Sequence, residues 1–163
     1  MKVAYSLFIL LLGLPLFASA DTDSNVRLIR NIWEVPLSEE SVANYENSIA
    51  QDVKVHGPHG QEHSGLESVK EFDATFATAF QEINTEIKEI LGFDDRVVVC
   101  WKWHAAHIGE YEGIPATGNT ITIDGIAMFR FDNAGKIVEI WTGWDNLNLC
   151  RQIATVTIVP NTI

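Results

Sequence analysis

Two ionisable side chains in this sequence have the types and positions needed for proton transfer. His107 ends a strand-like stretch whose inward side is otherwise apolar, and Asp145 directly follows the last main strand pattern. Histidine and carboxylate groups are common general acids and bases in enzymes. The two residues together predict acid–base catalysis without a cofactor, in which Thr142 and Tyr111 would orient the substrate.

Both residues also have a structural interpretation. Asp145 stands immediately before a helical pattern that contains Leu147, Leu149 and Ile153, and an aspartate at this place commonly caps the first helical turn. A histidine at a strand end can equally be a structural residue held by hydrogen bonds at the rim of the fold. The cap is the favoured interpretation of Asp145, whereas both interpretations of His107 stay open.

A histidine-rich stretch raises the question of a metal. His56, His59 and His63 lie close together, with Glu62 among them, and imidazole and carboxylate groups are zinc ligands. Their spacing fits no familiar zinc motif, and the surrounding glycines and proline indicate a loop. We therefore expect no metal and no cofactor, and we predict that this loop lies at the rim of a pocket.

Helical patterns occupy the first half of the chain. Apolar residues recur at helical spacing from Val26 to Trp33 until Pro36 ends the pattern, and Ser38 begins a second helix. The apolar residues of this second helix are Val42, Tyr45 and Ile49.

The strongest helical pattern starts at a capping box formed by Ser64 and Glu67. We expect its apolar face to pack against a sheet. The residues of that face are Leu66, Val69, Phe72, Phe76, Phe80 and Ile83.

Beyond this helix the apolar residues alternate, which is typical of strands. The β-branched run 154–159 adds either an edge strand or a trailing segment. Helices followed by hairpins indicate an α+β fold, in which the N-terminal helices cover the concave face of a curved antiparallel sheet. The main strand patterns are residues 84–91, 96–107, 119–131 and 136–144.

Alternation also assigns the strand faces. The inward set of 96–107 is apolar up to His107, and Gly125 allows the bend with which a sheet curls around a cavity. Trp141 has outward parity. The inward surface suits an apolar small-molecule pocket, although a filled core fits the same pattern. The residues predicted to contact a ligand are Trp101, Trp103, Tyr111, Ala127, Phe129, Ile140, Thr142 and Trp144.

The N-terminal residues 1–20 combine an early lysine, an apolar run and the cleavage-site pattern Ala18-Ser19-Ala20. This combination predicts a secretory signal peptide, and the apolar run is short for the alternative, a membrane anchor. We expect an exported protein, periplasmic or secreted. Its mature part, residues 21–163, would be a single domain that no membrane segment holds.

Net charge bears on the class of binding partner, and the cysteines bear on disulfide formation. The formal net charge is −11 at pH 7, and an acidic chain repels phosphate backbones, so we expect no nucleic acid partner. Cys100 and Cys150 are the only cysteines. In an oxidising compartment they would form one disulfide, or else remain as buried thiols, and the sequence leaves both alternatives open.

Several short segments in a fixed order carry a family resemblance. The chain resembles the SnoaL-like polyketide cyclases, also called ester cyclases, strongly over residues 95–153 and more weakly over 24–94. The resemblance implies a cone-shaped α+β barrel, which this family shares with ketosteroid isomerase, scytalone dehydratase and nuclear transport factor two. The segments are His107-x-Gly109, 113–118 (GIPATG), 129–131 (FRF), 135–139 (GKIVE), Trp141, Asp145 and Leu149-x-x-Gln152.

The resemblance also implies where the acid–base groups belong. In the polyketide cyclases an aspartate on the last strand acts in an intramolecular aldol closure, without metal or cofactor, near a histidine on the preceding strand. These two positions fall on Thr142 and Ala127 in this chain. A threonine hydroxyl cannot exchange a proton near neutral pH as a carboxylate does, so the family's mechanism is not available here in its usual form.

Three functions agree with these features. The first is cofactor-free cyclisation, isomerisation or hydrolysis of a hydrophobic compound such as a polyketide, with His107 and Asp145 as the acid–base pair. The second is a non-catalytic exported binding protein for such a compound, which the missing acid and the predicted export favour. The third is an interaction module that forms a homodimer through the outward face of the sheet.

Overall fold

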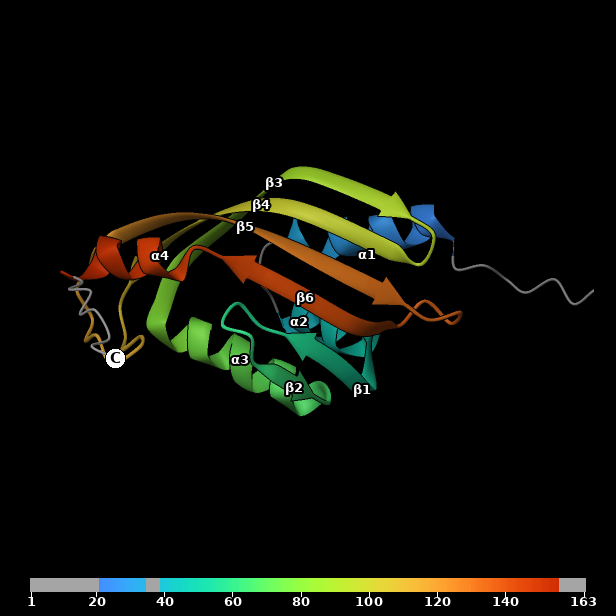
Figure 1. Ribbon diagram of the computed structural model, residues 1–163, viewed down its shortest axis with the longest axis horizontal. Helices are drawn as coiled ribbons and strands as arrows, with labels where there is room; N and C mark the ends of the chain where they lie inside the picture. Colours follow the sequence, from blue (N-terminus) through green and yellow to red (C-terminus); the bar gives the residue numbers. More distant parts are fainter. Residues whose placement is uncertain (1–20, 35–38, 156–163) are drawn as a thin grey trace, which may run out of the picture.

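The computed structural model describes residues 21–34 and 39–155, with only the backbone for residues 39–42 (Figure 1). The predicted signal peptide and the helix boundary predicted at Pro36 and Ser38 lie outside these residues. So does most of the predicted stretch 154–159. Its first two residues, Ala154 and Thr155, follow the last helix without forming a strand.

Four helices and six strands make up the described part of the chain. The helices are α1 (Thr22–Trp33), α2 (Glu39–Ser48), α3 (Leu66–Ala79) and α4 (Asn146–Ile153). The strands are β1 (Ile49–His56), β2 (Glu62–Ser64), β3 (Phe80–Phe93), β4 (Arg96–His107), β5 (Thr120–Phe131) and β6 (Ile137–Trp144).

The strands form one curved sheet in the order β2-β1-β6-β5-β4-β3, which confirms the α+β class (Figure 1). The sheet does not close on itself. It is also mixed rather than wholly antiparallel, because β1 pairs with β6 in parallel. The remaining neighbours, from β3 to β6 and from β1 to β2, are antiparallel as expected.

Strand β1 was not predicted. Ile49 fits the helical spacing of Val42 and Tyr45, but α2 ends at Ser48, whose hydroxyl donates to the carbonyl of Asn44 at 2.7 Å. The chain then becomes extended, and its apolar residues Ile49, Val53 and Val55 are buried in the core. Ile49 fits both the helical spacing and the alternation of a strand, so the sequence pattern did not reveal where the helix ends and the strand begins.

Both predicted ends of helix α3 were wrong. Gly65, not Ser64, is the residue before the first turn, with φ 92° and no side-chain cap, so the predicted capping box is absent. A positive φ of this kind favours glycine. At the other end the helix stops at Ala79, because Phe80 is extended with φ −132° and ψ 146°. Phe80 and Ile83 consequently belong to β3.

The predicted faces of the central strands are confirmed. In β4 every second residue from Val97 to His107 is buried, and Ile121, Ile123, Ala127, Phe129 and Phe131 of β5 are buried on the same side. Helix α1 covers this face over β3 and β4. Gly92 makes room for the helix, because a Cβ at that position would lie 2.6 Å from Thr22 Cγ2.

Two further findings concern the cysteines and the helices. Cys100 and Cys150 are free thiols and each is partly exposed, so of the two alternatives the structure shows no disulfide. Among residues 21–34 and 39–155, no helix combines the length and apolar character needed to cross a membrane.

Candidate active site

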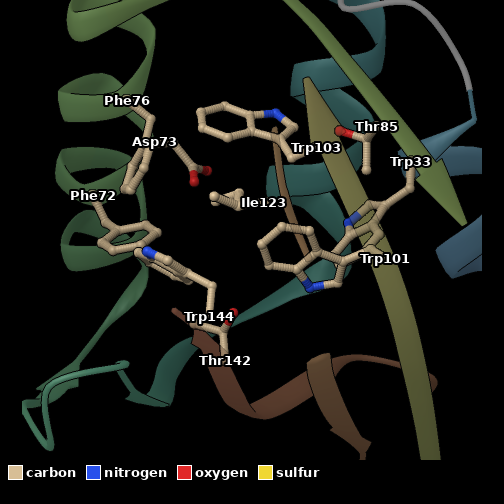
Figure 2. Close-up of a pocket in the computed structure, with 10 residues that line it drawn as sticks. All are labelled: Trp33, Phe72, Asp73, Phe76, Thr85, Trp101, Trp103, Ile123, Thr142 and Trp144. Atoms are coloured by element: carbon tan, nitrogen blue, oxygen red, sulfur yellow. The ribbon is translucent and has the colours of Figure 1, made fainter. Parts of the chain in front are cut away.

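Aromatic side chains from three parts of the fold surround a hollow of about 210 Å³ on the inward face of the sheet (Figure 2). Helix α3 contributes one wall, β4 and β6 contribute another, and the end of α1 closes one side. We call this space the aromatic hollow. Its lining residues are Trp33, Phe72, Asp73, Phe76, Thr85, Trp101, Trp103, Ile123, Thr142 and Trp144.

Asp73 is the only ionisable residue among these lining residues. It lies four residues after Val69 and three before Phe76, so it occupies the apolar stripe of α3 that faces the sheet. Figure 2 shows its carboxyl group directed into the middle of the hollow, beside Ile123. The helix therefore inserts one acid into an otherwise apolar and aromatic surface.

The environment of Asp73 changes its acidity. The accessible surface of Asp73 is large, because the hollow opens to solvent. Protein atoms nevertheless surround its carboxyl group. This desolvation, together with the negative charge of Glu46, raises the pKa of Asp73 from 3.8 to about 6. Lys70, one turn earlier, does not offset the effect, because it pairs with Glu46 at 3.3 Å and Glu67 at 3.2 Å.

Tyr45 lies beside this acid. Burial, and then the charge of Asp73, raise the pKa of the Tyr45 hydroxyl well above its usual value of 10.0. Tyr45 therefore remains protonated. Helix α2 brings Glu46 to Lys70 of α3 at 3.3 Å, and the charge of Glu46 acts on Asp73 as that of Asp73 acts on Tyr45. Helices α2 and α3 together set the electrostatic environment of the carboxyl group.

The position of Trp101 depends on a glycine in the next strand. Trp101 of β4 pairs directly with Gly125 of β5, and a Cβ at position 125 would overlap the indole ring. The ring therefore lies across Gly125 and contacts Trp33 and Trp144, each with a ring-centroid distance of 6.3 Å. Gly125 was predicted to allow a bend, and the structure shows that it makes space for a wall of the hollow.

The predicted ligand contacts divide into two groups. Trp101, Trp103, Thr142 and Trp144 line the aromatic hollow. The other four do not line it. Ala127, Phe129 and Ile140 are buried in the core, and Tyr111 is buried with its hydroxyl donating to Asn146 Oδ1 at 2.8 Å.

The two predicted catalytic residues lie elsewhere. His107 is fully buried with its Nδ1 3.0 Å from Thr117 Oγ1, and its Nε2 has no hydrogen-bond partner in the described part of the chain. Asp145 caps α4 by accepting from the backbone N–H of Asn148 at 2.9 Å. It also lines a second hollow, beside His59 and Cys150. Neither residue lines the aromatic hollow, and their catalytic role stays a prediction.

The histidine-rich stretch meets the outward face of the sheet. His56 Nε2 lies 2.9 Å from Glu139 Oε1, and the His56 ring stacks on Trp141 at a centroid distance of 4.8 Å. Arg130 donates to the other oxygen of Glu139 at 2.7 Å. Within the described ranges no three histidine, cysteine, aspartate or glutamate side chains gather as a metal site.

Asp73 was not predicted as a site residue, because the predicted catalytic residues lie at the ends of strand patterns. The signal was an aspartate inside the apolar stripe of a helix, at the position where Leu66, Val69 and Phe76 predict burial. A charged residue is rarely placed on such a stripe without a partner or a function.

Comparison with known proteins identifies the family of the chain. The sequence profile of the SnoaL-like polyketide cyclases matches residues 26–153. The chain belongs to this family. A comparison with curated proteins finds no match.

Solved structures of SnoaL-like and related proteins have the same fold. A protein from Jannaschia sp. CCS1, assigned as a SnoaL-like polyketide cyclase, has a TM-score of 0.73 and 18% identity, covering 86% of this chain and 96% of its own. AclR from Streptomyces galilaeus, assigned as a hydroxylase, has a TM-score of 0.71 and 22% identity, covering 85% and 86%. IdmH from Streptomyces antibioticus, assigned as a polyketide cyclase, has a TM-score of 0.65 and 23% identity, covering 78% and 96%.

In this SnoaL-like chain the two positions that the resemblance associates with catalysis face each other. Ala127 of β5 pairs directly with Thr142 of β6. Thr142 lines the aromatic hollow, and Asp73 lines the same hollow from the helix. Thr142, at the strand position where the family resemblance implies an aspartate, and Asp73 on the helix therefore line the same hollow.

Proposed function

We propose that this protein is a cofactor-free acid–base enzyme, a cyclase or isomerase, that acts on a small hydrophobic molecule in the aromatic hollow. The observation that carries the proposal is Asp73, a carboxyl group whose pKa is raised to about 6 inside a space lined mainly by aromatic rings. A general base works best when its pKa lies near the working pH. Asp73 meets that condition, and Thr142 does not.

The chemistry proposed for Asp73 is proton transfer at a carbon next to a carbonyl group. The carboxylate accepts the C–H proton, and the electron pair of that bond forms an enolate. In a cyclase the enolate carbon then forms a bond to a second carbonyl carbon of the same molecule, whose oxygen takes up the proton from Asp73, so that the carboxylate is restored. In an isomerase Asp73 returns the proton to a different carbon. The hydroxyl groups of Thr85 and Thr142 line the hollow and serve as donors to the substrate oxygen.

Family membership favours catalysis over the alternative of a non-catalytic binding protein. The acid missing from position 142 was one of two arguments for a carrier, beside the predicted export. Asp73 removes that argument, because it supplies an acid to the same hollow from another element. In this proposal the catalytic carboxylate has moved from strand to helix while the cavity has stayed in place.

The test is a comparison of three variants on a mixed panel of hydrophobic ketones, polyketide-like ring compounds and esters, with products identified by mass spectrometry. We expect Asp73→Asn to abolish formation of an isomeric product. The matched control is Asp124→Asn, because Asp124 is an exposed acid on the outward face of the sheet. His107→Ala tests the prediction from the sequence that His107 is an acid–base residue. Turnover that survives in Asp73→Asn and disappears in His107→Ala would overturn the proposal, and a compound retained unchanged would indicate a carrier.

We also propose export through the predicted signal peptide, residues 1–20. Sequencing of the N-terminus of protein recovered from the periplasm or the medium should give Asp21 as the first residue. An intact N-terminus on protein found only in the cytoplasm would contradict this.

A homodimer through the outward face is a further proposal. On β3 and β5 this surface exposes Leu91 by 55%, Phe93 by 47% and Ile126 by 55%, and exposed apolar side chains of this size are typical of interfaces. Light scattering should give twice the mass of the chain, and Ile126→Glu should give the mass of a monomer. A monomeric mass for the unchanged protein would contradict the dimer.

A further inference from the structure

The walls of the aromatic hollow are rich in indole rings. The chain has five tryptophans, and four of them, Trp33, Trp101, Trp103 and Trp144, line this one space together with Phe72 and Phe76. An apolar pocket needs only aliphatic side chains to exclude water. So many indole rings around one space indicate a ligand that interacts with the electron-rich faces of the rings.

The rings are arranged like the walls of a box. Trp33 and Trp101 meet at an interplanar angle of 80°, Phe76 and Trp144 at 85°, and Phe76 and Trp103 at 70°. Adjacent walls of a box meet at such steep angles, and rings placed in this way can turn their faces towards one central point. Figure 2 shows the rings of α3, β4 and β6 surrounding the space into which Asp73 projects.

The charge around the hollow is net negative. Among the described residues that line it, Asp73 is the only ionisable one, and the charge of Glu46 acts on Asp73. Lys70 pairs with both Glu46 and Glu67, so this group of three charges is itself net negative, and the whole chain carries a net charge of −11. A carboxylate and the faces of aromatic rings both attract cations, so the two features reinforce each other.

The size of the space sets a limit on what it can enclose. At about 210 Å³ it is smaller than the roughly 300–1,000 Å³ of most small-molecule pockets. A compact head group fits inside it, whereas the remainder of a larger molecule has to extend through the opening towards solvent.

We infer that the aromatic hollow binds an alkylated ammonium group, held by the indole and phenyl rings and by the Asp73 carboxylate. This inference rests on the proposed function, because it names the class of substrate for the same site: a hydrophobic compound that bears a tertiary or quaternary amine. The positive charge interacts with the ring faces, and its alkyl groups fill the space between them.

The test uses choline and its neutral carbon isostere, 3,3-dimethylbutan-1-ol, as paired probes in calorimetric titrations of the purified protein. The two molecules have the same shape and differ in the charge of one atom. We expect choline to bind at least about ten-fold more tightly. Asp73→Asn and Trp144→Phe should each weaken choline binding and leave the neutral alcohol nearly unchanged. Asp124→Asn, with the same loss of charge on the outward face, should change neither.

Each outcome decides the inference separately from the proposed function. Equal affinity for the two probes, or choline binding that is unaffected by Asp73→Asn, would overturn the cation site. Absence of binding by both probes would overturn it as well. If the ring-compound panel is then still turned over in an Asp73-dependent reaction, the proposed function stands with a neutral substrate. If the panel is not turned over either, both proposals fail.

Discussion

Two carboxylates on opposite sides of the sheet, Glu139 on strand β6 and Asp73 on helix α3, show how surroundings decide the role of one chemical group. On the outward face, burial raises the pKa of Glu139, but hydrogen bonds from His56 and Arg130 outweigh it and hold this pKa below its ordinary value of 4.5. On the inward face, Asp73 has neighbouring aromatic rings and a like charge, and its pKa is raised to about 6. We expect the paired acid to stabilise the fold, whereas an acid without a charged partner among the described residues suits the proton transfer proposed for it.

The largest expected effect is on catalysis. Asp73→Asn should lower kcat by roughly 10²–10⁴-fold, the usual contribution of a general base. Glu139→Gln should leave kcat nearly unchanged, because Glu139 belongs to the outward cluster with His56 and Arg130. Steady-state rates on the substrate found in the panel measure both. Equal losses in the two variants would remove the functional difference between the faces.

The pH dependence of the rate should identify the inward acid. As a general base Asp73 must be ionised, so kcat/KM should fall about tenfold per pH unit as the pH drops below about 6. The Asp124→Asn variant serves as the control and should show the same profile. A rate that stays constant between pH 7 and pH 4.5 would exclude Asp73 as the base.

A substitution beneath Trp101 tests how far the hollow depends on its walls. Gly125→Ala places a methyl group where the indole ring lies, so we expect a loss of about 1–3 kcal/mol in the free energy of unfolding and weaker ligand binding. Gly143→Ala on the neighbouring strand is the matched control, since a Cβ there meets nothing within 4 Å. Denaturant unfolding of both variants gives the comparison, and equal stabilities would contradict the close contact.

The outward acid should matter for stability. Glu139→Gln leaves the Arg130 guanidinium without its charged partner, so we expect a loss of about 1–3 kcal/mol at pH 7. The folded-state pKa is lowered, so this stabilisation is present above 4.5 and is lost as the pH falls. The exposed Glu71 of α3 provides the control, as Glu71→Gln. If Glu139→Gln lowers the free energy of unfolding as much at pH 3 as at pH 7, the ionised form of Glu139 does not stabilise the fold.

The smallest effect is a gain in stability from removal of the inward acid. The raised pKa of Asp73 means that the folded state is relatively more stable below 3.8 and loses this advantage as the pH rises through about 6. Asp73→Asn should therefore stabilise the protein at pH 7, by less than about 1 kcal/mol because the hollow is open to water. Melting curves at pH 7 and pH 3.5 measure the difference, which should be present only at pH 7. A loss of stability at pH 7 would show that Asp73 has a structural partner.

Much of the sheet could be predicted from the sequence. The bounds of β4 are those of the predicted pattern 96–107, and its inward set is buried as alternation requires. Helix α3 was found from its stripe, although both of its ends were misplaced. Strand β1 was not predicted, because Ile49 fits the spacing of a helix and the alternation of a strand equally well.

The lining of the aromatic hollow was anticipated only in part. Four of the eight expected ligand contacts line the hollow, because parity fixes the side of the sheet but not which inward residues border empty space. Ala127, Phe129 and Ile140 have the same inward orientation and are simply packed. Asp73 on α3 was not predicted, because its place in the hollow and its raised pKa depend on residues of other elements.

The sequence by itself determined the period of each element, the side of the sheet to which each strand residue points and the family resemblance, since all three depend on local order along the chain. Only the tertiary structure decided that Asp73, Thr142 and four tryptophans share one space, and that Glu139 has charged hydrogen-bond partners while Asp73 has none in the described part of the chain. A pKa depends on distances between groups that are far apart in the chain, and those distances exist only once the helices have packed against the sheet.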